Sequence, residues 1–285
     1  MLTINPKNIE IQKLHAYLLS AVAPRPIALA STLDEDGNPN LSPFSFFNVF
    51  SANPPILIFS PARRVRDNTT KHTFENVKKV KEVVINVVNY AMVHQTSLAS
   101  TEYGKGVDEF EKAGFTKLKS DKVKPFRVVQ SPVQFECRVN DIIALGQDGG
   151  AGNLIICEVV CLHLDESILD KNNAIDQVKL DLVARAGGSF YSRAKDTFFE
   201  IPKPLFTKGI GVDALPNYIK NSSVLTGNNL GMLGNVEKLP TQNDVDKFMK
   251  DNLKFIGIKL NEKHKFAQEY LKKNDIDSAW KVLLS

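Results

Sequence analysis

Six stretches of this chain combine alternating or continuous apolar residues with β-branched and aromatic side chains, a pattern typical of β-strands. They cover residues 27–33, 41–49, 56–60, 83–88, 133–145 and 154–164. Turn-forming residues separate the first two stretches, and a glycine-rich segment separates the last two. Both pairs are therefore expected to form antiparallel hairpins.

Helical spacing is confined to a few segments of the first 200 residues. Phe74 and Val77 lie at a helical interval within residues 69–80, where Thr or Asn can cap the helix. Residues 91–120 are polar and are expected to be mostly helical, with one helix ending at Gly114. Because few helices separate the strands, we expect a mainly β fold: a six-stranded antiparallel barrel or sandwich with peripheral helices.

A nucleotide-binding domain of the Rossmann type does not fit this order of elements. The glycines within residues 149–152 lack the GxGxxG spacing and precede a strand instead of a helix. We interpret this segment as a flexible turn.

The composition changes near the end of the β-rich part. Residues 201–240 are rich in Pro, Gly and Asn, and residues 241–285 have helical spacing after a capping-box pattern that starts at Thr241. We expect a β domain over residues 1–200 and a C-terminal extension over residues 201–285, loop-rich at first and then helical.

Composition also limits the function classes. The 285 residues carry a net charge of +4, and acidic and basic residues are interspersed outside one cluster, so nucleic acid is not an expected partner. The apolar runs are far shorter than the roughly 20 residues that a membrane helix needs. The first residues lack the basic and apolar pattern of a signal peptide. We expect a cytoplasmic protein that does not enter the membrane.

The cysteines and histidines do not indicate a metal site. Cys137, Cys157 and Cys161 form no CxxC pair and lie in or beside β-like stretches, so we expect them to be buried apolar residues. The five histidines are scattered, and no HxH, HExxH or Ser/His/Asp arrangement can be argued. If the protein catalyses a reaction, a bound organic cofactor is expected to supply the chemistry, and we name no catalytic side chain.

Residues 60–73 form the first candidate site, because they combine cations, hydroxyl groups and an expected helix N-terminus. Unpaired N–H groups, forked arginine donors and hydroxyls together suit a phosphate group. A solvated basic loop is the other interpretation, but the position directly after a strand favours an anion site. His72 is expected to be an exposed helix residue. The cations are Arg63, Arg64, Arg66 and Lys71, and the hydroxyl groups are those of Ser60, Thr69, Thr70 and Thr73.

Residues 45–48 form the second candidate site. Strand alternation sends Ser45 and Phe47 to one face and Phe46 and Asn48 to the other. Backbone and short polar side chains here could meet the hydrogen-bonding edge of a flat ring. An aromatic-rich strand of the core would have the same pattern.

The chain resembles the flavin reductase-like family of FMN-binding split-barrel proteins over residues 15–195, about two thirds of its length. The resemblance implies a six-stranded split barrel that forms a homodimer with FMN at the dimer interface. The motifs occur in the family's order and include residues 23–28, 40–48, 54–55, 71–73, 84–87, 108–114 and 184–188 with Tyr191.

The resemblance also implies a set of flavin contacts. It places the isoalloxazine ring against residues 45–48 and near Arg25, and the phosphate against Ser60, the arginine cluster, Lys71 and Thr73. The chain departs from the family pattern at His72, where many members have aspartate, and in a longer segment over residues 63–70. The expected cofactor-binding residues are Arg25, Ser45, Phe46, Phe47, Asn48, Ser60, Arg63, Arg66, Lys71, Thr73 and Asn86.

Three functional hypotheses follow. The first is an NADH- or NADPH-dependent flavin reductase that passes hydride to FMN and then electrons to an acceptor, such as a partner monooxygenase. The second is a flavoredoxin-like electron carrier that holds FMN and is reduced by a partner protein. The third is a non-enzymatic barrel that binds a polyanion through the basic loop, for which the sequence lacks a broad basic face with aromatic residues.

Overall fold

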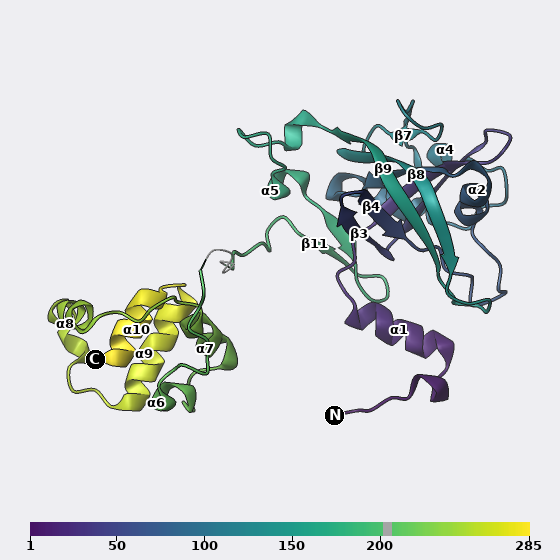
Figure 1. Ribbon diagram of the computed structural model, residues 1–285. Coiled ribbons are helices and arrows are strands. Elements are labelled where there is room, and N and C mark those ends of the chain that lie inside the picture. Colours follow the sequence, from purple (N-terminus) through teal and green to yellow (C-terminus); the bar gives the residue numbers. More distant parts are fainter. Residues whose placement is uncertain (202–206) are drawn as a thin grey trace. The chain divides into compact units, whose positions relative to one another are not determined.

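The computed structural model describes residues 1–201 and 207–285 (Figure 1). The chain divides into two compact units, Met1–Phe199 and Glu200–Ser285. Strands dominate the first unit, whereas over the described chain the helices contain more residues than the strands. The expected mainly β class therefore applies to the first unit only, and the chain as a whole is mixed.

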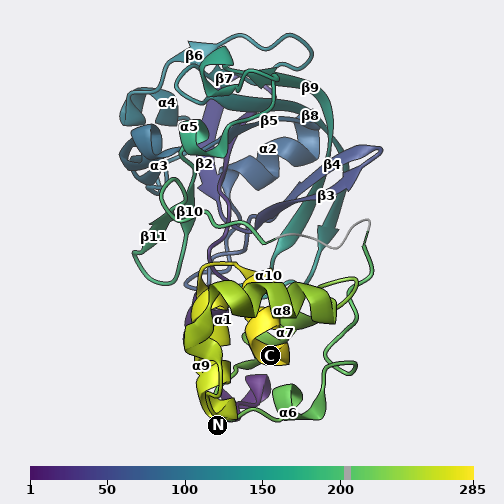
Figure 2. The same cartoon turned by 90° about the vertical axis from the view of Figure 1, so that its left-hand side faces the viewer.

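One seven-stranded antiparallel sheet organises the first unit (Figures 1 and 2). Its order is β2-β1-β5-β8-β9-β4-β3, so β2 and β3 occupy opposite edges although they are consecutive in the chain. The strands are β1 (Ala28–Leu33), β2 (Pro39–Phe44), β3 (Phe47–Ala52), β4 (Pro55–Phe59), β5 (Glu82–Val87), β8 (Val133–Ala144) and β9 (Asn153–Leu164).

The prediction of six strands was wrong because the stretch 41–49 is not one strand. β2 ends at Phe44 and β3 begins at Phe47, so Ser45 and Phe46 connect two edge strands. The carbonyl of Phe46 accepts a hydrogen bond from the Ser60 N–H at 2.8 Å. Phe44, Phe46 and Phe47 surround Ser45, so the segment resembles one aromatic-rich strand and the sequence conceals the break.

Apolar clusters form on both faces of the sheet. One contains Phe59, Ile85 and Cys157 together with Phe74 and Val77 of α2 (His72–Val80). The other packs the opposite face of β1 and β2 against α3 (Val93–Leu98) and α4 (Glu109–Ala113). Residues 91–120 are less helical than expected, because α3 and α4 are short and separated by loop; α4 does end at Gly114, which has a φ of 69°.

The remaining elements of the first unit are short, apart from the N-terminal helix. Cys137 and Cys157 are buried as expected, whereas Cys161 is partly exposed. The elements are η1 (Pro6–Asn8), α1 (Ile11–Ala21), η2 (Tyr90–Met92), β6 (Lys117–Leu118), β7 (Arg127–Val128), η3 (Glu166–Ile168), α5 (Gln177–Leu180), β10 (Val183–Arg185) and β11 (Tyr191–Arg193).

Helix α1 buries none of its residues. Ile11 and Leu18 are more than half exposed, and so is Val22, which follows the helix. On β3, Val49 and Phe50 are each 64% exposed. Two apolar surfaces of the first unit are thus left uncovered within the single chain.

Asn86 ties three elements together in the interior. Its side chain is fully buried, its Nδ2 donates to the Leu29 carbonyl at 3.0 Å, and its Oδ1 accepts from the Val128 N–H at 2.9 Å. The amide therefore adds buried hydrogen bonds to backbone groups of β1 and β7.

The second unit is a helical bundle with its own core. Trp280 is 1% exposed, and its indole N–H donates to the Leu233 carbonyl at 3.1 Å. The expected capping box is confirmed, since Thr241 and Asp244 cap each other's backbone at the start of α8. The helices are α6 (Asn217–Lys220), α7 (Gly227–Gly234), α8 (Gln242–Asp251), η4 (Leu253–Phe255), α9 (Leu260–Lys272) and α10 (Ile276–Leu284).

None of the helices described over residues 1–201 and 207–285 has the length and apolar character that crossing a membrane requires.

Replacement of Asn86 by alanine should destabilise the first unit without acting through a ligand. Two buried hydrogen bonds would be lost, at about 1–3 kcal/mol each. We expect a loss of roughly 2–4 kcal/mol in urea unfolding followed by circular dichroism, whereas exposed Asn140→Ala on β8 should change stability by less than about 0.5 kcal/mol. Equal effects of the two substitutions would contradict this structural role.

Candidate ligand-binding cleft

The free edge of β2 is the starting point of the cleft. Within the sheet β2 pairs only with β1, so its other edge has no strand partner. Buried Glu109 of α4 holds this edge, because its carboxylate accepts from the Leu41 N–H and from Asn40 Nδ2, both at 3.0 Å. Residues two apart in a strand direct their backbone groups to the same edge. The Pro43 carbonyl therefore also points away from β1.

A hollow of about 380 Å³ adjoins one end of β2. It combines apolar walls with hydroxyl groups and one cation, a composition suited to a flat ligand with polar edges. The Arg185 guanidinium lies 4.5 Å from the centre of the Tyr191 ring. The lining residues are Ile27, Pro43, Phe44, Ser45, Thr96, Ser97, Ser100, Arg185, Ser189 and Tyr191.

A second, much smaller hollow of about 20 Å³ adjoins the other end of β2. It shares Ser100 with the first, and both take residues from β2, so the two hollows follow each other along this strand. Basic and hydroxyl side chains dominate its lining. The lining residues are Asn40, Ser42, Arg64, Lys71, His72, Thr73, Ser100, Thr101, Glu102, Tyr103 and Glu109.

Glu102 is already ion-paired with the cations at the small hollow. Its carboxylate pairs with Arg64 at 2.9 Å, Arg66 at 3.1 Å and Lys71 at 3.4 Å. The hydrogen bond from Arg64 is the main cause that lowers the pKa of Glu102 to about 2. The hollow therefore has the charge and donors for an anion, and an incoming anion would have to displace this carboxylate.

The start of α2 contributes to the same hollow. Its N-cap residue, Lys71, makes no side-chain cap, so the expected Thr or Asn cap is absent at this position. Thr73 is buried, and its hydroxyl donates to Asn40 Oδ1 at 2.7 Å. His72 is half-buried instead of exposed. Burial, with Arg64 and other cations nearby, lowers the pKa of His72, which leaves the imidazole neutral at pH 7.

Arg25 lies next to the larger hollow and contacts Ser45, one of its lining residues. Its guanidinium donates to the Val22 carbonyl at 2.6 Å and to the Ala186 carbonyl at 3.2 Å, and its Nε lies 3.4 Å from the Ser45 hydroxyl. Burial, followed by the charge of Arg185, lowers the pKa of Arg25. Arg25 thus fixes the end of α1 and orients Ser45, and it does not line either hollow.

The side chains of residues 45–48 lie in different environments and do not form one site. Ser45 lines the larger hollow. Phe47 packs on the first apolar cluster, whereas Phe46 is 39% exposed and meets the His15 ring edge-on. Asn48 is exposed, and its Oδ1 accepts from the neighbouring Val49 N–H. Within the single chain, only Ser45 of the four lines the cleft.

Some of the expected anion ligands line the small hollow and others do not. Lys71 and Thr73 line the small hollow. Arg63 is instead bound to Asn68, and Ser60 packs against Gly152, where its buried hydroxyl meets no partner among the described residues. Arg66 reaches the site only through Glu102. Asn86 makes the interior contacts described above.

Arg64 and residues 100–103 complete the small hollow, and the list of expected ligands omitted them. Arg64 lies in the recognised basic loop, but nothing in the sequence distinguishes it from Arg63. Residues 100–103 belong to a polar loop with no motif of its own. The sequence did indicate Arg185 and Tyr191, because both belong to motifs that the chain shares with the flavin reductase-like family.

The fold and the cleft together define a β-sheet protein with a surface cleft that is basic at one end and broad at the other. A family model described as "Flavin reductase like domain" matches residues 20–179. An uncharacterized protein of Aquifex aeolicus is 35% identical over 188 residues, which are 66% of this chain and 93% of the relative.

Two solved structures are similar to the first unit. Nitrilotriacetate monooxygenase component B from Bacillus cereus is 27% identical with a TM-score of 0.66, over 70% of this chain and 98% of that chain. A putative flavin reductase with a split barrel domain from Shewanella frigidimarina is 25% identical with a TM-score of 0.61, over 71% of this chain and all of that one. The chain belongs to the flavin reductase-like family, and its fold is a split barrel.

Substitution of Glu102 by glutamine should strengthen the binding of a phosphorylated flavin. The change removes a competing negative charge from Arg64 and Lys71, so we expect FMN to bind about threefold to tenfold more tightly in a fluorescence titration. Riboflavin, which lacks the phosphate, should show no such gain, and neither should FMN with Glu111→Gln on the exposed side of α4. An unchanged or weaker FMN affinity would place the phosphate elsewhere.

Proposed function

We propose that the first unit binds FMN in the cleft along β2 and acts as an NADH- or NADPH-dependent flavin reductase. The observation that carries the proposal is the adjacency of a small hollow with cations and hydroxyls and a larger, partly apolar hollow along one strand edge. A phosphate at one end and a planar ring at the other match these two chemistries.

The residues present fit FMN once Glu102 moves aside. Arg64, Lys71 and the N-terminus of α2 would hold the phosphate, because they offer charged donors and free backbone N–H groups. The free edge of β2 near Pro43 and Ser45 would hold the polar edge of the ring. Bound FMN would supply the hydride-accepting chemistry.

The side chains of this cleft would bind and orient rather than exchange protons. Arg25 and Arg185 place positive charge behind and beside the larger hollow, which would stabilise negative charge on a reduced ring. Tyr191, stacked under Arg185, forms a flat wall. The neutral His72 at the other end has no role in proton transfer in this proposal.

The choice of a reductase over an electron carrier is supported by the relatives' names. One similar structure is a monooxygenase component and another is a putative flavin reductase. A reductase component would pass its electrons to a partner monooxygenase or another acceptor. A flavoredoxin-like carrier, the second hypothesis, would bind FMN in the same cleft without oxidising pyridine nucleotides.

Turnover separates these two functions. The FMN-loaded protein should oxidise NADH or NADPH with multiple turnovers when oxygen or excess flavin accepts the electrons, as followed by the loss of reduced nicotinamide absorbance. A matched sample without flavin should show no turnover. A yellow protein that leaves both nucleotides unoxidised would contradict the reductase and leave FMN binding intact.

We further propose that a second copy of the chain covers the apolar surfaces on α1 and β3. Val49 and Phe50 lie on the strand that follows the Ser45 side of the cleft, and Ile11 and Leu18 lie on the helix whose end Arg25 holds. A homodimer through these surfaces would bury apolar area next to the ring end of the cleft. FMN would then bind at or near the interface.

Phe50→Glu should disrupt this homodimer, because it puts a charge into the covered apolar surface. Light scattering after gel filtration should give twice the chain mass of 31.7 kDa for the wild type and a lower mass for the variant. Leu253→Glu, at an equally exposed apolar residue of the second unit, should leave the mass unchanged. A monomeric wild type, or a Phe50→Glu protein that remains dimeric, would contradict the interface.

A further inference from the structure

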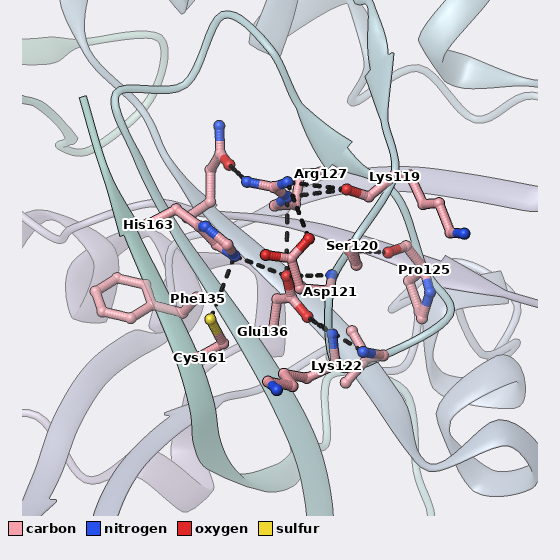
Figure 3. A network of polar contacts seen from close by, with 12 residues as sticks. Lys119, Ser120, Asp121, Lys122, Pro125, Arg127, Phe135, Glu136, Cys161 and His163 are labelled. Atoms are coloured by element: carbon pink, nitrogen blue, oxygen red, sulfur yellow. Dashed lines mark hydrogen bonds and ion pairs between the residues drawn. The ribbon is translucent and has the colours of Figure 1, made fainter.

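Four side chains of different chemistry gather on the sheet outside the cleft. They are Asp121 from the loop before β7, Glu136 from β8, and Cys161 and His163 from β9 (Figure 3). One potential ligand atom from each lies within 4.8 Å of the other three. Thiolate, imidazole and carboxylate are the ligands that proteins offer to zinc.

A β-bulge brings Cys161 and His163 to this face. Glu136 pairs with Cys161 and Cys137 pairs with Val159, so Val160 is an extra residue in β9. Before the bulge, Cys157 points into the apolar cluster on the inner face. After it, the alternation is reversed, and Cys161 faces the same side as Glu136. Bulges commonly re-aim side chains in this way.

Two distances among the side chains can be compared with those of a tetrahedral zinc centre. Cys161 Sγ and His163 Nε2 are 3.5 Å apart, which is about the edge expected for zinc bonds of roughly 2.3 Å to sulfur and 2.0 Å to nitrogen. His163 Nε2 and Glu136 Oε1 are 2.7 Å apart, a hydrogen-bond distance. These two atoms would need to separate by about half an ångström to share a metal ion.

Backbone groups hold Glu136 in position. Its side chain is fully buried, and its carboxylate accepts from the N–H groups of Asp121 at 2.8 Å, Lys122 at 2.5 Å and Val123 at 3.1 Å. The same loop carries the Asp121 side chain. A preorganised carboxylate with hydrogen-bonded oxygens is typical of metal sites, where outer contacts orient the ligands.

The charges also balance with a divalent ion. Arg127 pairs with Asp121 at 3.6 Å and with Glu136 at 3.8 Å. Two carboxylates and a Cys161 thiolate carry three negative charges, which one divalent cation and the Arg127 guanidinium neutralise. Asp121 leaves an access path, because its side chain is 59% exposed.

We propose that Asp121, Glu136, Cys161 and His163 bind one Zn²⁺ ion per chain. Four protein ligands would form a closed, structural site that fastens the loop before β7 to the β8–β9 hairpin. Binding releases the thiol proton of Cys161 to solvent, and the metal forms bonds to Cys161 Sγ and His163 Nε2. His163 binds as a neutral imidazole whose one proton is on Nδ1, so a doubly protonated ring would also release one proton to solvent. The site is separate from the proposed flavin cleft, with which it shares no lining residue.

Equilibrium dialysis of the full-length, reduced and chelator-treated protein against micromolar Zn²⁺ tests the site, with bound metal counted by atomic emission. We expect about one zinc per wild-type chain. Cys161→Ala and His163→Ala should each weaken binding more than about tenfold, since even loss of an outer contact costs 10-fold to 100-fold. Cys157→Ala and exposed His94→Ala, which remove the same groups elsewhere, should bind as the wild type does.

Thermal unfolding provides a second readout on the same proteins. Zn²⁺ should raise the melting temperature of the wild type and of both control variants, but not that of Cys161→Ala or His163→Ala, because a metal stabilises only the fold that binds it. FMN binding by the variants would show that they are folded. Substoichiometric zinc in the wild type, or equal zinc affinity in all variants, would overturn the proposal and leave a hydrogen-bonded cluster without a metal.

Discussion

The uncovered edge of β2 is the constraint on which the first unit depends. β2 and β3 are joined by two residues yet lie on opposite edges of the sheet, so β3 cannot pair with β2. The Glu109 carboxylate satisfies part of the free edge, and the remainder faces the two hollows. The split in the barrel and the cleft therefore have one cause, the two-residue connection at Ser45 and Phe46 that takes the chain from one edge of the sheet to the other.

Charge sets the other property of the cleft. Arg64 and Lys71 are held by Glu102, so the anion end is preformed and internally neutralised. Exchange of this carboxylate for a phosphate would keep the cations paired in both states, which avoids a cluster of unpaired positive charge in the free protein. The helical second unit lies outside the region that the family model matches.

The local sequence pattern was sufficient to predict most strands of the sheet. It did not predict the break between β2 and β3 or the residues of the cleft. Strand alternation and turn residues identified β1, β4, β5, β8 and β9, because these signals lie within each strand. The break at Ser45 was hidden because the phenylalanines around it make the segment resemble one aromatic-rich strand. Glu102 and Arg64 could not be chosen, since their pairing depends on a loop nearly 40 residues away, and the face of Cys161 depends on a bulge that no residue type announces.

Hydrogen–deuterium exchange of the full-length protein, with and without FMN, tests the cleft most directly because it reports on each backbone segment. If the cleft along β2 binds the flavin, amides of residues 40–45, 71–73 and 100–103 should exchange more slowly with FMN. Amides of residues 207–285 should be unchanged. Protection confined to residues 60–68, or to the second unit, would contradict the central claim.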